Sequence, residues 1–178
     1  MELCRFGKED HPAIKALYSG AFPANERAPF GLLTARARQG RADFWVIRLD
    51  RAAIGMAYVV TRKDLAYLFY FAIAPSFRGK GYGTGALKAI MERYRGFRLF
   101  LALEDWREEA DNRAQRIRRH EFYLHCGLHD LPHRLKEASV IYAMMGSGGP
   151  IEPEEYKDMM NRYVGFPMRF LVDMRIIP

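Results

Sequence analysis

The chain has 178 residues, of which 49% are hydrophobic and 28% charged, and its formal net charge is +7. This size allows one domain with a substantial core and is too small for two ordinary domains. The positive charge suits phosphate groups or acidic acceptors, but no zinc-finger spacing or aromatic-interleaved basic strip accompanies it, so we do not expect nucleic acid as the principal partner.

The first half of the chain predicts a strand, two helices and a pair of antiparallel strands. Residues 1–6 favour a short strand, and apolar residues at helical spacing follow over residues 10–20. A second helical pattern covers residues 31–39. Residues 43–49 and 52–61 are rich in β-forming side chains, and the two residues between them match a tight hairpin.

The second half predicts alternating strands and helices. Residues 67–74 are almost entirely apolar, as expected of a central strand buried on both faces. A helix ending near Tyr94 follows, then a buried strand over residues 97–103. A long polar helix is predicted for residues 108–126, with a further strand over residues 140–145.

The C-terminal segment begins with a glycine-rich break at residues 146–149. Acidic residues around Pro153 predict a helix start, and this helix should run to about Tyr163. An apolar segment with β character covers residues 166–177. Because about 30 residues cannot hold a core alone, we expect this segment to pack as an extension, residues 146–178, on the main domain.

Cysteine usage and hydropathy predict the environment of the protein. Cys4 and Cys126 lie far apart and form no CxxC pair, which indicates reduced thiols. Residues 1–5 lack a long apolar core, and no run approaches the ~18 apolar residues that span a bilayer. We therefore expect a soluble, cytoplasmic protein with no membrane partner.

The most informative stretch follows the central strand. Four glycines occupy every second position from Gly79 to Gly85, Arg78 and Lys80 stand beside them, and a helical pattern begins at once. Glycines let the backbone turn closely around a ligand, while the next helix directs free N–H groups and its positive end into the turn. The stretch predicts an anion site suited to a diphosphate.

Three phosphate-binding templates compete for this loop, and two fit poorly. A Walker A loop requires Ser or Thr after the Gly-Lys pair, but Gly81 follows Lys80. The dinucleotide fingerprint matches in relaxed form through Gly81, Gly83 and Ala86, with Glu104 near the spacing of a ribose-binding acid. That fingerprint belongs in the first turn of a βαβ repeat, whereas this loop comes late in the chain. A nucleotide-dependent oxidoreductase is therefore only a secondary interpretation.

The third template is a family signature. The run Arg78-Gly79-Lys80-Gly81-Tyr82-Gly83 resembles the Arg/Gln-x-x-Gly-x-Gly/Ala signature of the GNAT family of N-acetyltransferases. The resemblance implies an α/β (α+β) fold over residues 1–145, with a mixed sheet of six to seven strands flanked by helices. It implies acetyl-CoA as acyl donor, with its pantetheine arm along the strand that contains Phe71 and Ile73. Its pyrophosphate would be held by Arg78, Gly79, Lys80, Gly81, Tyr82, Gly83 and Thr84.

The same resemblance implies a general acid. Residues 122–128 resemble the Tyr-x-x-x-Gly-Phe setting of the family, with Leu128 in place of Phe, so Tyr123 would protonate the departing CoA thiolate. The alternative is an aromatic core residue whose hydroxyl bonds to the backbone. Asn112 lies eleven residues before Tyr123, which does not match the family's usual Asn, so we assign it no CoA contact.

The proton acceptor and the acceptor site are predicted from position. Glu104 ends a buried strand and could take the amine's proton directly or through water, although a solvated turn or a helix cap explains it equally well. Glu26 and Arg27 lie in the proline-bounded loop between the two early helices, which lines the acceptor site in GNAT proteins. Ordinary surface charge is the alternative for both.

Two further chemistries are not expected. Four histidines surround Cys126, but they show no HExxH or paired-cysteine spacing, so we predict no metal. Cys126 as an acylated nucleophile is disfavoured, since burial near a helix end accounts for it.

The sequence thus predicts an acetyl-CoA-dependent N-acyltransferase that moves an acetyl group to a primary amine of a small molecule or peptide, by direct transfer in a ternary complex. The alternative is a non-catalytic acyl-CoA sensor or interaction domain of the same fold. The identity of the acceptor is left open, and the resemblance is compatible with a homodimer.

Overall fold

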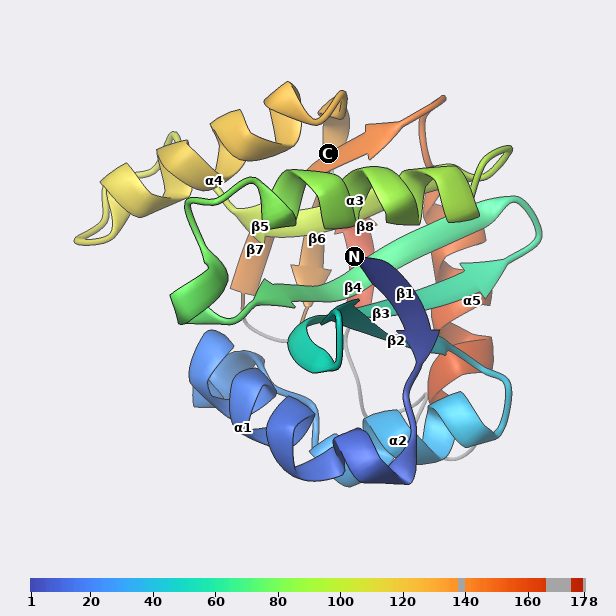
Figure 1. Cartoon of the computed structure of the whole chain (residues 1–178). Helices are drawn as coiled ribbons and strands as arrows, with labels where there is room; N and C mark the ends of the chain where they lie inside the picture. The colour runs from blue at the N-terminus through green and yellow to red at the C-terminus, as the bar shows by residue number, and fades with distance from the viewer. Residues whose placement is uncertain (138–139, 166–173, 178) are drawn as a thin grey trace. The chain divides into compact units, whose positions relative to one another are not determined.

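The structure is a computed structural model, and it describes residues 1–137, 140–165 and 174–177 (Figure 1). In these residues the strands form a mixed sheet with the order β1-β2-β3-β4-β5-β7-β6-β8. The chain divides into two compact units: residues 1–61 with 68–95, and residues 62–67 with 96–178. The strand β4 (Leu65–Ile73) contributes residues to both units.

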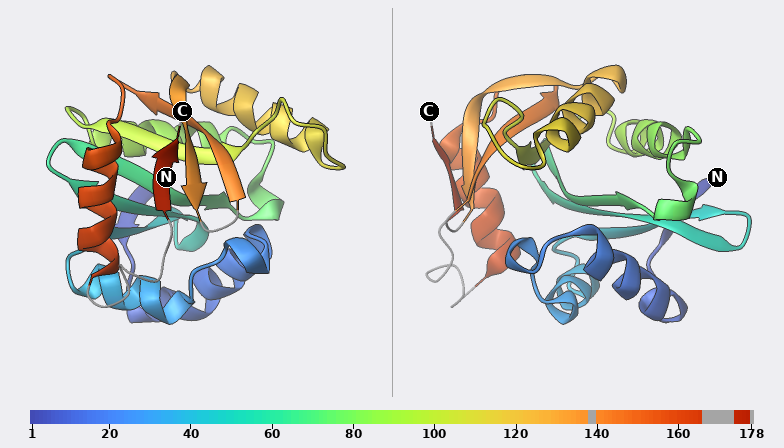
Figure 2. Two further views of the ribbon diagram at one scale, coloured as in Figure 1. Left: turned by 180° about the vertical axis from the view of Figure 1, so that it is seen from behind. Right: turned by 90° about the vertical axis from the view of Figure 1, so that its left-hand side faces the viewer.

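The first unit contains the N-terminal strands and three helices. Its elements are β1 (Glu2–Arg5), α1 (His11–Ala21), α2 (Phe30–Arg38), β2 (Asp43–Leu49), β3 (Ala52–Arg62), the end of β4, and α3 (Tyr82–Arg93). β1 pairs with β2, and β2 with β3, in antiparallel register. Figure 2 shows α1 and α2 on one side of these strands and α3 on the other, so both faces of the strands are covered.

Local sequence explains these elements. Ile14 and Tyr18 lie four residues apart on α1, the spacing of one helix face, and both are buried. The hairpin between β2 and β3 turns at Asp50, a residue type that tolerates its positive φ of 54°. Val46 and Ile47 of β2 are fully buried, as expected of a strand covered on both faces.

The second unit is built around β5. Its elements are the start of β4, β5 (Arg98–Glu104), α4 (Arg113–His125), β6 (His129–Glu137), β7 (Val140–Ser147), α5 (Pro153–Val164) and β8 (Met174–Ile177). β5 runs parallel to β4, and the ladder joins Leu65, Ala66 and Tyr67 to Arg98, Leu99 and Phe100. β7 pairs antiparallel with β5 and with β6, and β8 pairs antiparallel with β6.

Most predicted elements are confirmed, with three corrections. β7 continues through Gly146 and Ser147, where the glycine-rich break was predicted to begin. α4 begins at Arg113 rather than at residue 108, because residues 105–112 form turns. β6 was not predicted, and with it the sheet has eight strands in the residues that the structure describes. The predicted α/β architecture is confirmed. Residues 166–173 of the predicted C-terminal apolar segment lie outside the described residues, and residues 174–177 form β8.

The helix α5 packs within the second unit. Tyr156 is completely buried, and its ring lies 6.1 Å from that of Tyr67 and 6.3 Å from that of Phe100. The boundary that we predicted between residues 145 and 146 stays a prediction. None of the helices in the described part of the chain is both long and apolar enough to cross a bilayer.

Candidate active site

The glycine-rich turn joins the end of β4 to the start of α3. A short 3-10 helix (Pro75–Phe77) follows β4, and Gly81 is the N-cap of α3. Gly79 and Gly81 have φ values of +72° and +81°, which L side chains adopt only with strain. Apart from its chain neighbours, a Cβ added to either glycine would meet no atom of the described residues within 4 Å. The positive φ values thus favour glycine at both positions, and the described residues leave open space beside Gly79 and Gly81.

The N-terminus of α3 gives this open turn a positive end. The amides of Tyr82, Gly83 and Thr84 belong to the first helical turn, which has no intrahelical acceptors for its N–H groups. The first helical bond is donated by the Gly85 N–H to the Gly81 carbonyl, at 3.0 Å. Three successive N–H groups and the helix dipole are therefore available to an anion.

Two basic side chains stand beside the turn. The Arg78 Nε donates to the Ile73 carbonyl at 2.9 Å, and the Lys80 Nζ donates to the Ser76 carbonyl at 3.1 Å. Both residues are exposed. The hydrogen bonds fix the side chains against the loop while their charges stay accessible to a ligand.

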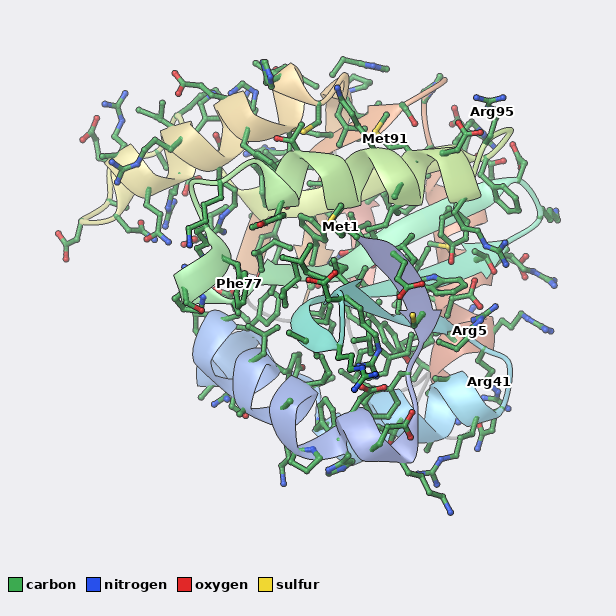
Figure 3. All side chains as sticks on the ribbon, in the orientation of Figure 1. Met1, Arg5, Arg41, Phe77, Met91 and Arg95 are labelled. Carbon is green, nitrogen blue, oxygen red and sulfur yellow. The ribbon has the colours of Figure 1, made fainter. Side chains whose placement is uncertain are left out.

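The turn is anchored on the apolar core of the first unit. Phe71, Phe77 and Tyr82 are partly buried against a cluster made of Ile47, Ile54, Ile73 and Ala86. Figure 3 labels Phe77 where the chain leaves β4 and approaches α3. Side chains on both sides of the turn hold its ends, so the glycine segment is presented on a fixed base. Phe71 and Tyr82, predicted as cofactor contacts, also have this packing role.

Tyrosine hydroxyls fix the loop that contains Glu26 and Arg27. The Tyr70 hydroxyl donates to the Glu26 carbonyl and accepts from the Ala28 N–H, each at 3.0 Å. The Tyr18 hydroxyl donates to the Ala28 carbonyl at 2.9 Å. The Arg27 guanidinium donates to a carbonyl of α1 at 2.9 Å. Glu26 and Arg27 are partly exposed on this fixed segment.

In the second unit, Glu104 is held by three side chains. Its Oε1 lies 2.9 Å from Arg116 Nη2, and its Oε2 lies 3.5 Å from Arg119 Nη1. The Asn112 amide donates to both oxygens, at 3.2 and 3.3 Å. The Asn112 carbonyl oxygen in turn accepts from Arg116 Nε at 2.8 Å. Glu104 therefore ties the end of β5 to the start of α4.

Tyr123 lies on α4 and is buried, with 8% of its surface exposed. Burial raises the pKa of its phenol to about 12, because the phenolate is less well solvated than in water; the charge of Arg119 partly opposes this rise. Among the residues that the structure describes, its hydroxyl has no hydrogen-bond partner. The backbone bond that would make it a purely structural tyrosine is not found there.

The arginine partners of the Glu104 and Asp105 carboxylates were not predicted from the sequence. Arg116 and Arg119 belong to an arginine-rich run over residues 113–119, and their i,i+3 spacing puts them on one face of a helix. Asp105 is buried and pairs with Arg107 at 2.8 Å, and this bond lowers the pKa of the carboxyl group. Asn112 contacts both Glu104 and Arg116.

The histidines of this region have structural contacts. His120 stacks on Trp106 with ring centroids 3.5 Å apart, and its Nε2 lies 2.8 Å from an oxygen of Asp130. Cys126 is buried where α4 ends. In residues 1–137, 140–165 and 174–177, no three His, Cys, Asp or Glu side chains are grouped so that they could hold a metal ion.

The predicted site residues thus fall into two sets. Phe71, Ile73 and residues 78–84 all lie within residues 71–84 of the first unit, which also contains Glu26 and Arg27. Glu104 and Tyr123 belong to the second unit, where Glu104 is tied to the helix that carries Tyr123. The open turn, its helix N-terminus and its two cations together suit a phosphate-bearing anion.

A family model and known structures were compared with the chain. The model of the acetyltransferase (GNAT) family matches residues 11–128, which is more than half of the chain. Among curated proteins, no sequence matches significantly.

Solved structures show the same fold at low sequence identity. A structure described as a GNAT-family acetyltransferase from Bacteroides thetaiotaomicron aligns with a TM-score of 0.73 and 20% identity, covering 92% of this chain and 96% of that one. The ribosomal-protein-alanine N-acetyltransferase of Brucella melitensis aligns with a TM-score of 0.59 and 16% identity, covering 83% and 99%. A Bacillus subtilis acetyltransferase in complex with CoA aligns with a TM-score of 0.58 and 13% identity, covering 82% and 95%.

These findings confirm the fold class and favour the acetyltransferase signature over the dinucleotide fingerprint for the glycine turn. The chain belongs to the GNAT family of acetyltransferases.

Proposed function

We propose that this protein is an acetyl-CoA-dependent N-acyltransferase that moves an acetyl group to a primary amine of a small molecule or peptide, by direct transfer in a ternary complex. The observation that carries the proposal is the turn at residues 78–84, where two positive-φ glycines leave the N-terminus of α3 uncovered. A known structure of similar fold contains CoA.

The donor would bind through backbone and charge. The N–H groups of Tyr82, Gly83 and Thr84 would donate to pyrophosphate oxygens, with Arg78 and Lys80 supplying positive charge. Phe71 and Ile73, at the end of β4, would line the pantetheine arm. Acetyl-CoA supplies the acetyl group as a thioester.

Tyr123 is the proposed general acid. As the amine nitrogen bonds to the acetyl carbon, the carbon–sulfur bond breaks and the sulfur leaves with the electron pair. A phenol with a pKa of about 12 is fully protonated at neutral pH, so its proton is available to that sulfur. The hydroxyl has no competing partner among the described residues.

Glu104 is the proposed acceptor of the proton that the amine loses. Both of its oxygens already contact arginine or asparagine side chains, so we propose transfer through a water molecule rather than direct contact. Arg116 and Arg119 would keep the carboxylate in place during this step.

The acceptor is proposed to contact Glu26 and Arg27. Tyrosine hydroxyls fix the loop that contains both residues, and a fixed loop can select an acceptor by shape and charge. One protein of similar fold is a ribosomal-protein-alanine N-acetyltransferase, so peptide amines belong in the panel beside small amines. We also propose a cytoplasmic location; a homodimer remains compatible with the family.

A thiol-release assay with acetyl-CoA tests the proposal. Wild-type protein is incubated with a panel of polyamines, amino acids, aminoglycosides and short peptides, and free CoA thiol is measured. Amine-dependent release above the rate of hydrolysis is expected for at least one acceptor class. CoA binding by calorimetry without thiol release for any amine would support the sensor alternative instead.

A further inference from the structure

The first unit contains a pocket that is separate in sequence from the glycine turn. A pocket of about 380 Å³ lies between the end of β1, the start of α1, the helix α2 and the start of β2. This volume is within the range of small-molecule sites. Its lining residues are Arg5, Phe6, Gly7, Lys8, His11, Thr34, Ala37, Arg38, Ala42 and Phe44.

The floor of the pocket is aromatic and fixed. The rings of Phe6 and Phe44 stack with centroids 4.4 Å apart, and the Phe6 N–H donates to the Phe44 carbonyl at 2.9 Å. The ring of His11 meets Phe30 edge-on at 5.2 Å. Phe44, Ala42 and Thr34 are buried. A flat apolar group would therefore meet a rigid surface.

The rim of the pocket carries excess positive charge. Three of its lining residues are Arg or Lys, and none is acidic. Arg5 is paired with Asp43, and Figure 3 shows it on β1. Lys8 and Arg38 are exposed and form no ion pair with any residue in the described part of the chain.

The acidic groups near the pocket offset only part of this charge. Glu9 lies at the edge, with its carboxylate against Gly7. Asp10 is paired with Arg48 and also accepts from the Gly7 N–H. The ammonium group of an acetyl acceptor would be repelled by Lys8 and Arg38. Lys8 and Arg38 outnumber Glu9, so the pocket favours a negatively charged occupant.

We propose that this pocket binds a small organic anion, a carboxylate or phosphate joined to a flat apolar body. Lys8 and Arg38 contact the anionic group, while the partly exposed Phe6, backed by the buried Phe44, lies against the apolar part. The proposal goes beyond acetyl transfer and does not depend on it. Under this proposal Lys8 and Arg38, which contribute to the net charge of +7, bind a ligand.

Phenyl phosphate is a suitable probe for calorimetric titration, with phenol as the uncharged control. The pocket variant is Lys8→Gln/Arg38→Gln, which changes only exposed side chains. The matched variant is Lys15→Gln/Arg51→Gln, which removes the same charge from exposed residues outside the pocket. A third variant, Lys80→Gln, reports binding at the glycine turn.

We expect phenyl phosphate to bind wild-type protein more tightly than phenol, and the pocket variant to weaken that binding by about tenfold or more. The matched variant and Lys80→Gln should bind the probe as wild-type protein does. Equal weakening in both double variants would overturn the proposal, because only net charge would then matter. Loss of binding in Lys80→Gln alone, equal binding of phenol, or no binding at all would also overturn it.

Discussion

Burial sets the protonation state of Tyr123, the residue to which we assign the acid step. An ordinary tyrosine has a pKa near 10, whereas burial raises the pKa of the Tyr123 phenol to about 12. A group with a raised pKa keeps its proton to higher pH. The acid form of Tyr123 should therefore persist through the alkaline range in which most amine acceptors lose their own protons.

Tyr123→Phe should lower turnover by about 10²- to 10⁴-fold, the usual contribution of a positioned acid or base, and leave acetyl-CoA affinity unchanged. The fold should survive, because the hydroxyl has no partner among the described residues. Wild-type turnover should not fall between pH 8 and pH 10.5. Steady-state kinetics and calorimetry check both results, and Tyr94→Phe is the control.

The control variant Tyr94→Phe removes a hydroxyl that bonds to other side chains of the first unit. Tyr94 donates to Asp43 and accepts from the Trp45 indole at 2.9 Å, so its loss should lower stability and spare turnover. Unchanged turnover in Tyr123→Phe at every pH would remove Tyr123 from the acid role.

Glu104→Gln separates a base from a structural anchor. A glutamine side chain keeps the size of glutamate and one acceptor oxygen, but its amide cannot accept the proton that the amine loses. If Glu104 accepts the amine's proton, kcat should fall at neutral pH and recover toward the wild-type value as pH rises above the pKa of the acceptor amine, which then arrives deprotonated. A kcat deficit that is the same at every pH, together with a lower melting temperature, would assign Glu104 to holding α4 alone.

At the scale of elements, β3 and β4 approach each other closely at Gly55. A Cβ there would lie 2.7 Å from the Ala72 carbonyl oxygen and 2.7 Å from the Ile73 side chain, at the end of the strand that leads into the glycine turn. A side chain at this position would have to displace backbone, not only the end of a flexible side chain.

Gly55→Ala should therefore destabilise the protein by about 1–3 kcal/mol, as overpacking does. Gly31→Ala is the matched control, because a Cβ at this helical position meets nothing within 4 Å. It should stabilise by about 0.5–1 kcal/mol through the unfolded chain and helix propensity. Urea unfolding measures both, and a neutral Gly55→Ala would show that the strands can separate without cost.

The elements that sequence could predict are those with strong local signals. β4 is an unbroken apolar run, and α1 has one clearly buried face. α3 begins directly after closely spaced glycines, which are typical of a turn. β6 could not be predicted, because residues 129–137 alternate irregularly, include Pro132 and have only one buried residue, Leu135. Its pairing with β7 and β8 comes from tertiary structure.

The start of α4 was misplaced for a related reason. Residues 108–112 are polar and compatible with a helix, but Asp105 binds both the backbone and the side chain of Arg107 at 2.8–2.9 Å. Asn112 then engages Glu104 at the N-cap of α4. The Asp105 bonds are local to the turn and the Asn112 bond joins the start of α4 to the end of β5, and neither kind of bond is visible in hydrophobic periodicity. The same limit hid Arg116 and Arg119.

For the whole molecule, arginine–carboxylate pairs predict how stability depends on pH. Arg98 binds Glu155 at 2.6 Å and Asp64 at 2.8 Å, and these hydrogen bonds lower the pKa of both carboxyl groups. A carboxyl group whose folded pKa is lowered contributes stability above its unfolded pKa of about 4. That contribution is lost as pH falls through the folded pKa.

Stability should therefore decrease below about pH 4, and Arg98→Gln should reduce the size of that decrease while lowering stability at pH 7. Urea unfolding at pH 7, 4 and 3 makes the comparison. Arg95→Gln is the control, since its pair with Glu92 is exposed on both sides and should contribute little. An identical acid response in Arg98→Gln and wild-type protein would contradict the assignment.

We propose that the turn at residues 78–84 binds the pyrophosphate of CoA. The most direct measurement is calorimetric titration of CoA, and of pantetheine, which lacks the pyrophosphate, into wild-type protein, Gly81→Val and Gly40→Val. Gly40 has a similar positive φ of +66° and equally open surroundings, so it controls for backbone strain.

We predict that Gly81→Val weakens CoA binding by about tenfold or more, with pantetheine binding little affected and CoA binding by Gly40→Val like that of wild-type protein. Equal CoA affinity in Gly81→Val and Gly40→Val would contradict the claim.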